Sequence, residues 1–180
     1  MAKRVFDIVI ASVLLILTLP LFLYAAIGLK IESPNLPVIF GGQRVGKGGR
    51  LFTHYRFRTM AGQPLRKTPF GRRIGNLSLD DLPTLWNVLR GDMSLIGPRP
   101  EGPDTVDFAD SDWQKVLSIK PGVISLGILT LLDSYNATSV KERIQPEVEY
   151  AAHQSLRYDL SLIGRALVLW LKMGHLKGKF

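Results

Sequence analysis

The sequence predicts an α+β fold that is mostly helical, and three observations support this prediction. The N-terminal 32 residues are dominated by an apolar run long enough for a membrane helix. A Gly-rich turn followed by alternating residues predicts a small β-hairpin. Two acidic residues and a proline then open a short helix that ends at a glycine. We therefore expect a kinked membrane helix over residues 1–32 and a folded body over residues 33–180.

Composition narrows the class of protein. The chain of 180 residues is long enough for one domain with its own core. Its 23 Lys and Arg outnumber 15 Asp and Glu, for a formal net charge of +8. Such a surplus suits nucleic acid, an anionic membrane surface or a phosphorylated substrate. No nucleic-acid-binding motif accompanies the charge, and nucleic-acid binding leaves the apolar N-terminus unexplained, so we expect no nucleic-acid partner. Cysteine is absent, which excludes a disulfide framework.

Residues 5–29 form an apolar run whose only charged member is Asp7. A secretory signal is disfavoured because the run is too long and no A-x-A-like cleavage site follows it. Pro20 removes a backbone donor and predicts a kink. Lys3 and Arg4 precede Asp7 at helical spacing, so we expect them to pair with it on one helix face.

Basic residues flank this run on both sides, and positive charge favours the cytoplasmic side of a membrane. A re-entrant helix that bends at Pro20 keeps both flanks inside. A single spanning anchor is the alternative, and the residues alone do not separate the two. Near the other end, residues 160–173 are too short to span a bilayer comfortably and predict an interfacial amphipathic helix. A buried core helix is the alternative there.

Residues 38–40 and 51–57 are the predicted strands of the hairpin. The intervening residues 41–47 satisfy most of the P-loop pattern. Gly48 follows them, however, so no hydroxyl is available for magnesium, and the next residues alternate like a strand. We therefore predict a hairpin turn and no P-loop.

The acidic pair Asp80-Asp81 follows a basic stretch and precedes Pro83. Ser78 stands at capping-box spacing from Asp81, and Pro83 belongs in the first helical turn. The helix should then run to Gly91, a favourable C′ residue. The two carboxylates are either simple helix starters or a reactive pair. In the second case one attacks phosphorus and the other binds Mg²⁺.

Basic side chains on both sides of this pair are candidates for phosphate binding. Pro98 and Pro100 fix the backbone around Arg99 and should aim its side chain with little loss of entropy. A structural loop with a surface arginine is the alternative. Ahead of the pair the basic residues are Arg56, Arg58, Arg66, Lys67, Arg72 and Arg73.

The block FGRRIGNLSLDDLPTLWNVLRGDMSLIGPRP resembles the bacterial sugar transferase family, the small monotopic phosphoglycosyl transferases that begin glycan assembly on polyprenol phosphate. The resemblance covers nearly the whole chain. Further matching motifs are the opening KR-x-x-D, the sequences QRVG at 43–46 and FRTM at 57–60, and Tyr150, Ser155 and Asp159.

The resemblance implies a mechanism and a location. Asp80 matches the nucleophile, Asp81 the Mg²⁺-binding acid, and Arg99 and Arg58 two basic residues of the site. The implied reaction transfers a sugar 1-phosphate from a UDP-sugar to polyprenol (undecaprenyl) phosphate through an aspartyl intermediate and releases UMP. Residues 33–180 would then form a cytoplasmic catalytic domain on the bacterial inner membrane, held at the lipid bilayer by a re-entrant helix. Such a reaction begins lipopolysaccharide, capsule, exopolysaccharide or glycoprotein assembly.

Four departures from the family pattern qualify this expectation. Asp81 stands where the family has Glu, and Gly75 where it usually has Arg, so that phosphate contact is either missing or supplied by Arg72 or Arg73. Residues 124–128 differ from the family's sequence, and Leu19 replaces a serine before Pro20. A non-catalytic membrane scaffold that binds polyprenol phosphate is therefore the alternative. The sugar is not indicated, and a homo-oligomer is left open.

Overall fold

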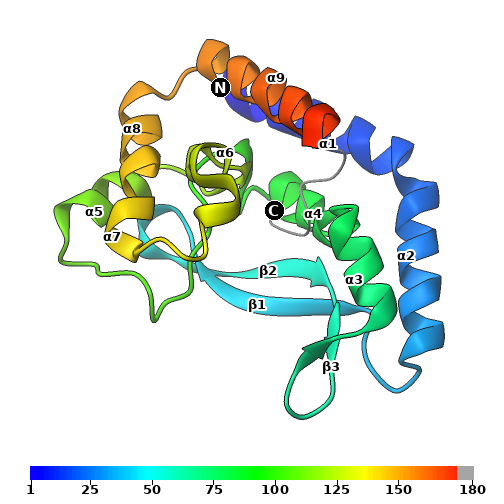
Figure 1. Ribbon diagram of the computed structural model, residues 1–180. Helices are drawn as coiled ribbons and strands as arrows, with labels where there is room; N and C mark the ends of the chain where they lie inside the picture. The colour runs from blue at the N-terminus through cyan, green and yellow to red at the C-terminus, as the bar shows by residue number, and fades with distance from the viewer. Residues whose placement is uncertain (174–180) are drawn as a thin grey trace.

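The computed structural model describes the backbone of residues 1–173 and, except for Asp133, the side chains of residues 1–169 (Figure 1). This part of the chain is mostly helical with short strands, as the sequence predicts. In chain order its helices and strands are α1 (Ala2–Leu17), α2 (Leu19–Glu32), β1 (Ile39–Val45), β2 (Leu51–Phe57), β3 (Met60–Ala61), β4 (Arg66–Lys67), α3 (Pro69–Asn76), the 3-10 turn η2 (Leu79–Asp81), α4 (Thr84–Arg90), β5 (Ser94–Ile96), α5 (Ser111–Leu117), β6 (Gly122–Ile124), α6 (Leu126–Leu131), α7 (Val140–Arg143), α8 (Gln145–His153) and α9 (Leu156–Met173).

The predicted N-terminal kink is confirmed at Thr18, where α1 and α2 meet at 61°. Pro20 lies in the first turn of α2, where its missing donor is harmless. The Thr18 hydroxyl donates a hydrogen bond to the Leu14 carbonyl at 2.7 Å. Within residues 1–173, no single helix is long and apolar enough to cross a bilayer. The bent pair meets that requirement by length and composition alone.

Contrary to the prediction, Asp7 pairs with neither Lys3 nor Arg4, which bind other partners. Its Oδ1 instead accepts hydrogen bonds at 3.1 Å from the Ser94 hydroxyl and from the Leu95 backbone amide of β5. Asp7 is buried, so its carboxylate needs donors that water does not supply. These two bonds tie α1 to β5.

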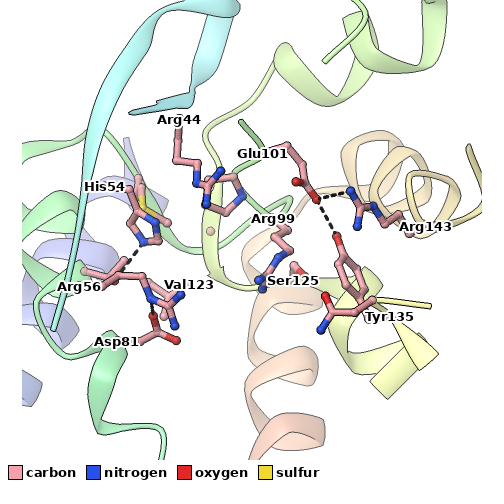
Figure 2. A pocket seen from close by; sticks show the side chains of 15 residues that line it. Arg44, His54, Arg56, Asp81, Arg99, Glu101, Val123, Ser125, Tyr135 and Arg143 are labelled. Atoms are coloured by element: carbon pink, nitrogen blue, oxygen red, sulfur yellow. Dashed lines mark hydrogen bonds and ion pairs between the residues drawn. The ribbon is translucent and has the colours of Figure 1, made fainter. Parts of the chain in front are cut away.

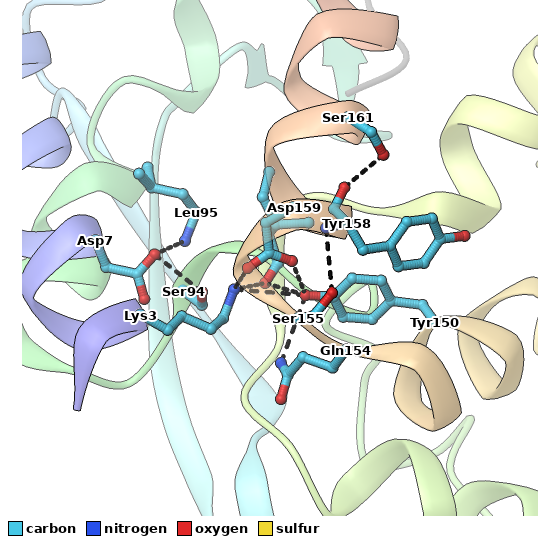
Figure 3. Close-up of polar contacts among 11 residues, drawn as sticks. Lys3, Asp7, Ser94, Leu95, Tyr150, Gln154, Ser155, Tyr158, Asp159 and Ser161 are labelled. Carbon is cyan, nitrogen blue, oxygen red and sulfur yellow. Dashed lines mark hydrogen bonds and ion pairs between the residues drawn. The ribbon is translucent and has the colours of Figure 1, made fainter.

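Lys3 and Arg4 also reach beyond their own helix. The Lys3 ammonium forms an ion pair with Asp159 of α9 and donates to the Ile96 carbonyl of β5 at 3.1 Å (Figure 3). Arg4 donates to the carbonyls of Val88 and Leu89, in the last turn of α4. A cation at a helix C-terminus satisfies free carbonyls and favours the helix dipole. The N-terminal motif therefore attaches the bent apolar helix pair to the rest of the fold.

The predicted hairpin is confirmed, but its first strand is longer than predicted. β1 runs on through residues 41–45, and these glycines and their neighbours pair in register with β2. The turn occupies residues 46–50, with φ of 68° at Gly48 and 76° at Gly49. Antiparallel pairing overrides the weak strand preference of glycine here. No helix follows the turn, so the P-loop is excluded as expected.

The apolar core of the described residues has three clusters: a main one formed by α1, α4, β5, α6, α8 and α9, one between α5 and the end of β1, and one where α2 covers β2 and α3. The short parallel pair of β5 and β6 is not predicted from the sequence, nor are α3 and α5–α8. Helix α9 contributes Leu162 to the core and leaves Leu160 and Leu167 exposed, and its position at a membrane interface stays a prediction. The side chains of the predicted interfacial residues Trp170 and Lys172 lie outside the described part.

Candidate functional site

The acidic pair lies in the 3-10 turn η2, directly ahead of α4. The predicted helix is confirmed up to Gly91, which has a φ of 90°. The predicted capping box is wrong, because Ser78 adopts a φ of 56° and its side chain makes no capping bond. Pro83 immediately precedes α4, so Asp80 and Asp81 come before that helix and not in its first turn.

A single arginine from β2 holds both carboxylates. Arg56 donates to Oδ2 of Asp80 at 2.8 Å and to Oδ1 of Asp81 at 2.5 Å. Asp80 is 7% exposed, and its Oδ1 is buried without a hydrogen-bond partner. Burial raises the pKa of Asp80, and it raises the pKa of Asp81 to about 6, although Arg56 opposes both changes.

Asp81 and Arg56 line a cavity of about 120 Å³ between the hairpin and the loops after β5 and β6 (Figure 2). Four guanidinium groups surround it against the carboxylates of Asp81 and Glu101, which favours an anionic ligand. Its principal polar lining residues are Arg44, His54, Arg56, Asp81, Thr84, Arg99, Glu101, Ser125, Tyr135, Asn136 and Arg143.

The Pro-Arg-Pro loop contributes Arg99 and Pro100 to this cavity, as its rigid backbone suggested. The Arg99 guanidinium lies over the Tyr135 ring, with Cζ 5.2 Å from the ring centroid. Pro98 is buried behind them and lines an adjoining small cavity. Arg99 and Asp81 therefore line the same cavity, although they come from different segments of the chain.

Other predicted site residues lie elsewhere. Asp80 is not among the residues that line the cavity, although Arg56 connects it to Asp81. Arg58 lines a second cavity of about 190 Å³ along the hairpin. Arg72 and Arg73 are exposed on α3 and line none of the cavities described for residues 1–173.

Near Gly75, where the family usually has an arginine, the structure places another basic side chain. The Lys67 ammonium lies 3.7 Å from the point that a Cβ at Gly75 would occupy. Its charge acts to lower the pKa of Asp80, as a smaller cause than burial, which raises it, and than Arg56 and a backbone hydrogen bond, which also lower it. Lys67 belongs to the basic stretch noted in the sequence, but only the fold shows that it lies near Gly75.

His54 is a site residue that the sequence pattern did not single out. Burial, followed by the charges of Arg56 and Arg44, lowers its pKa to about 3, so the ring is neutral. The Thr84 hydroxyl donates to the Tyr55 carbonyl at 3.1 Å, and His54 Nε2 lies 3.1 Å from that hydroxyl. Strand alternation places His54 and Arg56 on one face of β2, which is the signal that predicts their proximity.

The carboxylate pair meets the chemical requirement for magnesium only in part. Among the described residues there is no cluster of three or more acidic or histidine side chains. Mg²⁺ commonly takes one or two carboxylates and completes its shell with water and substrate phosphates. Asp81, which lines the cavity, and the partnerless Oδ1 of Asp80 supply two such carboxylate groups, so the rest of the shell would come from water and substrate.

Fold and site together define a protein with an arginine-lined cavity beside an acidic pair, joined to a bent apolar helix pair. Residues 1–173 match the family model of the bacterial sugar transferases, and the chain belongs to this family. It is thus a member of an enzyme family of transferases.

Three curated relatives illustrate the similarity. The undecaprenyl-phosphate galactose phosphotransferase of Salmonella typhimurium is 38% identical, covering 89% of this chain and 38% of the relative. The undecaprenyl-phosphate glucose phosphotransferase of Komagataeibacter xylinus is 44% identical, covering 89% of this chain and 34% of the relative. The UDP-glucose:undecaprenyl-phosphate glucose-1-phosphate transferase of Caulobacter vibrioides is 35% identical, covering 92% of this chain and 68% of the relative. The chain therefore spans under half of the first two and about two thirds of the third.

Proposed function

We propose that the protein transfers a sugar 1-phosphate from a UDP-sugar to a polyprenol phosphate, as the names of its relatives suggest. One observation carries the proposal. Arg56, in the wall of a cavity lined by further arginines, binds two adjacent carboxylates, of which Asp80 is buried and Asp81 lines the cavity. Such a site neutralises a diphosphate and places a nucleophile beside it.

In the first half of the reaction, a carboxylate oxygen of Asp80 attacks the phosphorus that carries the sugar. A bond forms between this oxygen and phosphorus, and the bond from phosphorus to the UMP oxygen breaks. UMP leaves with the electron pair, and an aspartyl-phosphosugar remains. Oδ1 accepts no hydrogen bond in the described part of the chain, so its electron pairs are not engaged by the protein.

In the second half, a phosphate oxygen of the polyprenol phosphate attacks the same phosphorus. The bond from phosphorus to Asp80 breaks, and the carboxylate is regenerated. Each half exchanges one phosphorus–oxygen bond for another, so no oxidant or additional reactant is needed. Arg56 stabilises the Asp80 carboxylate both as the nucleophile and as the leaving group.

The arginines divide the charge of the donor between them. Arg99, Arg44 and Arg143 converge on the cavity from three different segments (Figure 2). Their planar donors suit phosphate oxygens. We assign Mg²⁺ to Asp81 with Asp80 beside it; when bound, the ion neutralises charge on phosphate oxygens. Because the Asp81 side chain is one methylene shorter than Glu, its contact is direct only if the ion lies close to η2.

We place the catalytic body on the cytoplasmic face of the bacterial inner membrane. The bent pair α1 and α2 exposes many apolar side chains, including Ile16, Leu17 and Leu19 around the break. Basic residues flank the pair on both sides, which favours a re-entrant path that returns to the same face. The acceptor phosphate of a membrane lipid then lies at the level of the site.

The test incubates purified protein with a panel of UDP-sugars, Mg²⁺ and undecaprenyl phosphate, and measures UMP. Asp80→Asn should abolish UMP release and the mass increase of the intact protein that marks the adduct. Asp104→Asn, at an exposed turn, is the matched control and should behave like the wild type. Folded wild-type protein that releases no UMP with any donor would contradict the proposal.

A non-catalytic scaffold that binds polyprenol phosphate is the second candidate. It is favoured by one observation, which is that Arg56 occupies both carboxylates while Asp80 does not line the cavity. The Asp80→Asn variant separates the two functions in cells. A scaffold keeps its role in glycan assembly with this variant, whereas the enzyme loses it.

A further inference from the structure

Two cavities lie next to each other along one face of the hairpin. The first is the arginine-lined cavity that contains Asp81. The second, of about 190 Å³, shares Arg44, His54 and Arg56 with it. Alternation along both strands puts these shared side chains on the same face. The second cavity is lined by Phe40, Gly42, Arg44, His54, Arg56, Phe57, Arg58, Thr59, Met60 and Leu65.

The linings of the two cavities differ in chemistry. Beyond the shared wall, the first is formed mainly by charged and hydroxyl side chains, whereas Phe40, Phe57, Met60 and Leu65 dominate the second. Leu65 is 67% exposed and Met60 is 43% exposed. An exposed apolar surface of this kind gains free energy when an apolar ligand covers it.

The second cavity also adjoins the end of the membrane-directed helix pair. Phe57, in its back wall, packs against Phe22 of α2, with ring centroids 4.8 Å apart. Arg58 and Met60 line a further small cavity together with Leu29, near the C-terminus of α2. A chain that leaves the bilayer along α2 therefore meets this apolar cavity before the catalytic one.

Positive charge accompanies the apolar lining. The Arg58 guanidinium lies over the Phe40 ring at 5.3 Å, and its Nε donates to the Pro37 carbonyl at 3.1 Å. Arg56 stands in the shared wall and contacts both carboxylates. The combination suits an amphiphile with an apolar chain and a phosphate group that Arg56 and Arg58 could bind.

We infer that the second cavity binds the prenyl segment next to the phosphate of the acceptor lipid. The inference rests on the proposed function, and adds to it a separate acceptor subsite formed by the hairpin and the β3–β4 loop. The cavity is smaller than the pockets that enclose drug-sized ligands, so it takes only the first isoprenyl units. The residues shared by the two cavities, which include Arg56, then hold the acceptor phosphate close to the Asp80 adduct.

The test separates the two half-reactions in a Leu65→Glu variant. UMP released without acceptor measures the donor half, and transfer to undecaprenyl phosphate measures the acceptor half. Leu65→Glu should leave UMP release unchanged and raise the KM for the acceptor about tenfold or more, since it places charge where the chain binds. Leu51→Glu, an exposed leucine at the far end of β2, is the matched control and should change neither half. Met60→Glu repeats the test if Leu65→Glu does not fold.

Calorimetry with farnesyl phosphate and with inorganic phosphate tests binding directly. The wild type should bind farnesyl phosphate at least about tenfold more tightly than inorganic phosphate, and Leu65→Glu should remove that preference. An unchanged acceptor KM in both variants would overturn the inference. A raised KM for the UDP-sugar alone would also overturn it, because the cavity would then hold the nucleotide base. Wild-type protein that releases no UMP refutes the proposed function instead, and the farnesyl phosphate measurement still decides the subsite.

Discussion

The backbone amide of Arg99 donates a hydrogen bond to Oε1 of Glu147 on α8, with an N···O distance of 3.3 Å. Glu147 is 4% exposed, and its Oε2 is buried without a hydrogen-bond partner. The same Oε1 would lie 2.6 Å from a Cβ at Gly127, so the glycine leaves room for the carboxyl group. Glu147 therefore fixes the backbone from which the Arg99 side chain reaches the cavity.

Replacing Glu147 by glutamine should make stability less dependent on pH. Burial raises the pKa of Glu147 to about 7, against the opposing hydrogen bonds from Arg99 and Ser125. Between pH 4.5 and 7 the folded state then holds a proton that the unfolded state has released. The contribution of this carboxyl group to the free energy of unfolding is present at low pH and is lost as pH rises through 7. The loss amounts to about 3 kcal/mol. Urea unfolding of both proteins at pH 5 and pH 8 measures the difference.

The matched control for this prediction is Glu149→Gln, two residues along α8 on the exposed side. It should leave the pH dependence of the wild type intact. Activity gives an independent reading, since Glu147→Ala should raise the KM for the UDP-sugar through Arg99 more than Glu147→Gln does. Equal pH slopes in the wild type and in Glu147→Gln would show that the carboxyl group is not held in its uncharged form.

Lys67 should be exchangeable with an arginine at position 75. Its ammonium lies 3.7 Å from the place of a Cβ at Gly75, beside the acidic pair. Lys67→Ala should lower kcat/KM for the UDP-sugar about tenfold, as expected for a lost bond to a charged group. Adding Gly75→Arg in the same chain should restore most of that loss. Arg66→Ala, next to Lys67 in β4, is the control and should have little effect. If Gly75→Arg did not restore kcat/KM, the prediction that the two positions are exchangeable would be wrong.

Local patterns predict the parts of this site that depend on neighbours in the sequence. The helix after Asp81 and its end at Gly91 follow from a proline, a short apolar pattern and a C′ glycine. The hairpin follows from alternation in residues 51–57. Both signals lie within about one helical turn or one strand, so tertiary contacts change their boundaries but not their existence.

The remaining parts depend on contacts between distant segments. β5 and β6 have three residues each, too few for a recognisable pattern, and their pairing joins residues more than 25 positions apart. Glu147 looks like an ordinary charged residue of a short helix, and only the fold places it under Arg99. Asp7 likewise had apparent partners at helical spacing, but burial against β5 gave it better donors.

Removing Arg56 alone should destabilise the protein more than removing the charges around it. Arg56→Met leaves two neighbouring carboxylates in a mostly buried position without their cation. Breaking such a pair on one side costs about 3 kcal/mol or more, whereas replacing the whole group by neutral residues is often nearly neutral. The triple variant Arg56→Met, Asp80→Asn and Asp81→Asn should therefore regain most of the lost stability in urea unfolding. Arg50→Met, at the exposed hairpin turn, is the control and should change stability little. A triple variant as unstable as Arg56→Met would show that the unpaired carboxylates are not the cause of the instability.

Two helical glycines should respond to alanine in opposite directions. A Cβ at Gly28 of α2 would lie 2.1 Å from Cζ of Phe70, so the ring that packs α3 against α2 must move. Overpacking of this kind costs about 1–3 kcal/mol and outweighs the gain in helix propensity. At Gly164 of α9 no atom of the described residues, apart from its chain neighbours and the helix's own backbone, lies within 4 Å of the added carbon, so only the propensity gain of up to about 1 kcal/mol remains. Unfolding in detergent micelles should show Gly28→Ala less stable and Gly164→Ala slightly more stable than the wild type. Because α3 leads directly into the turn that contains Asp80, Gly28→Ala should also slow UMP release. A Gly28→Ala variant with normal stability and a normal rate would contradict this prediction, since it would show that Phe70 moves without loss of stability.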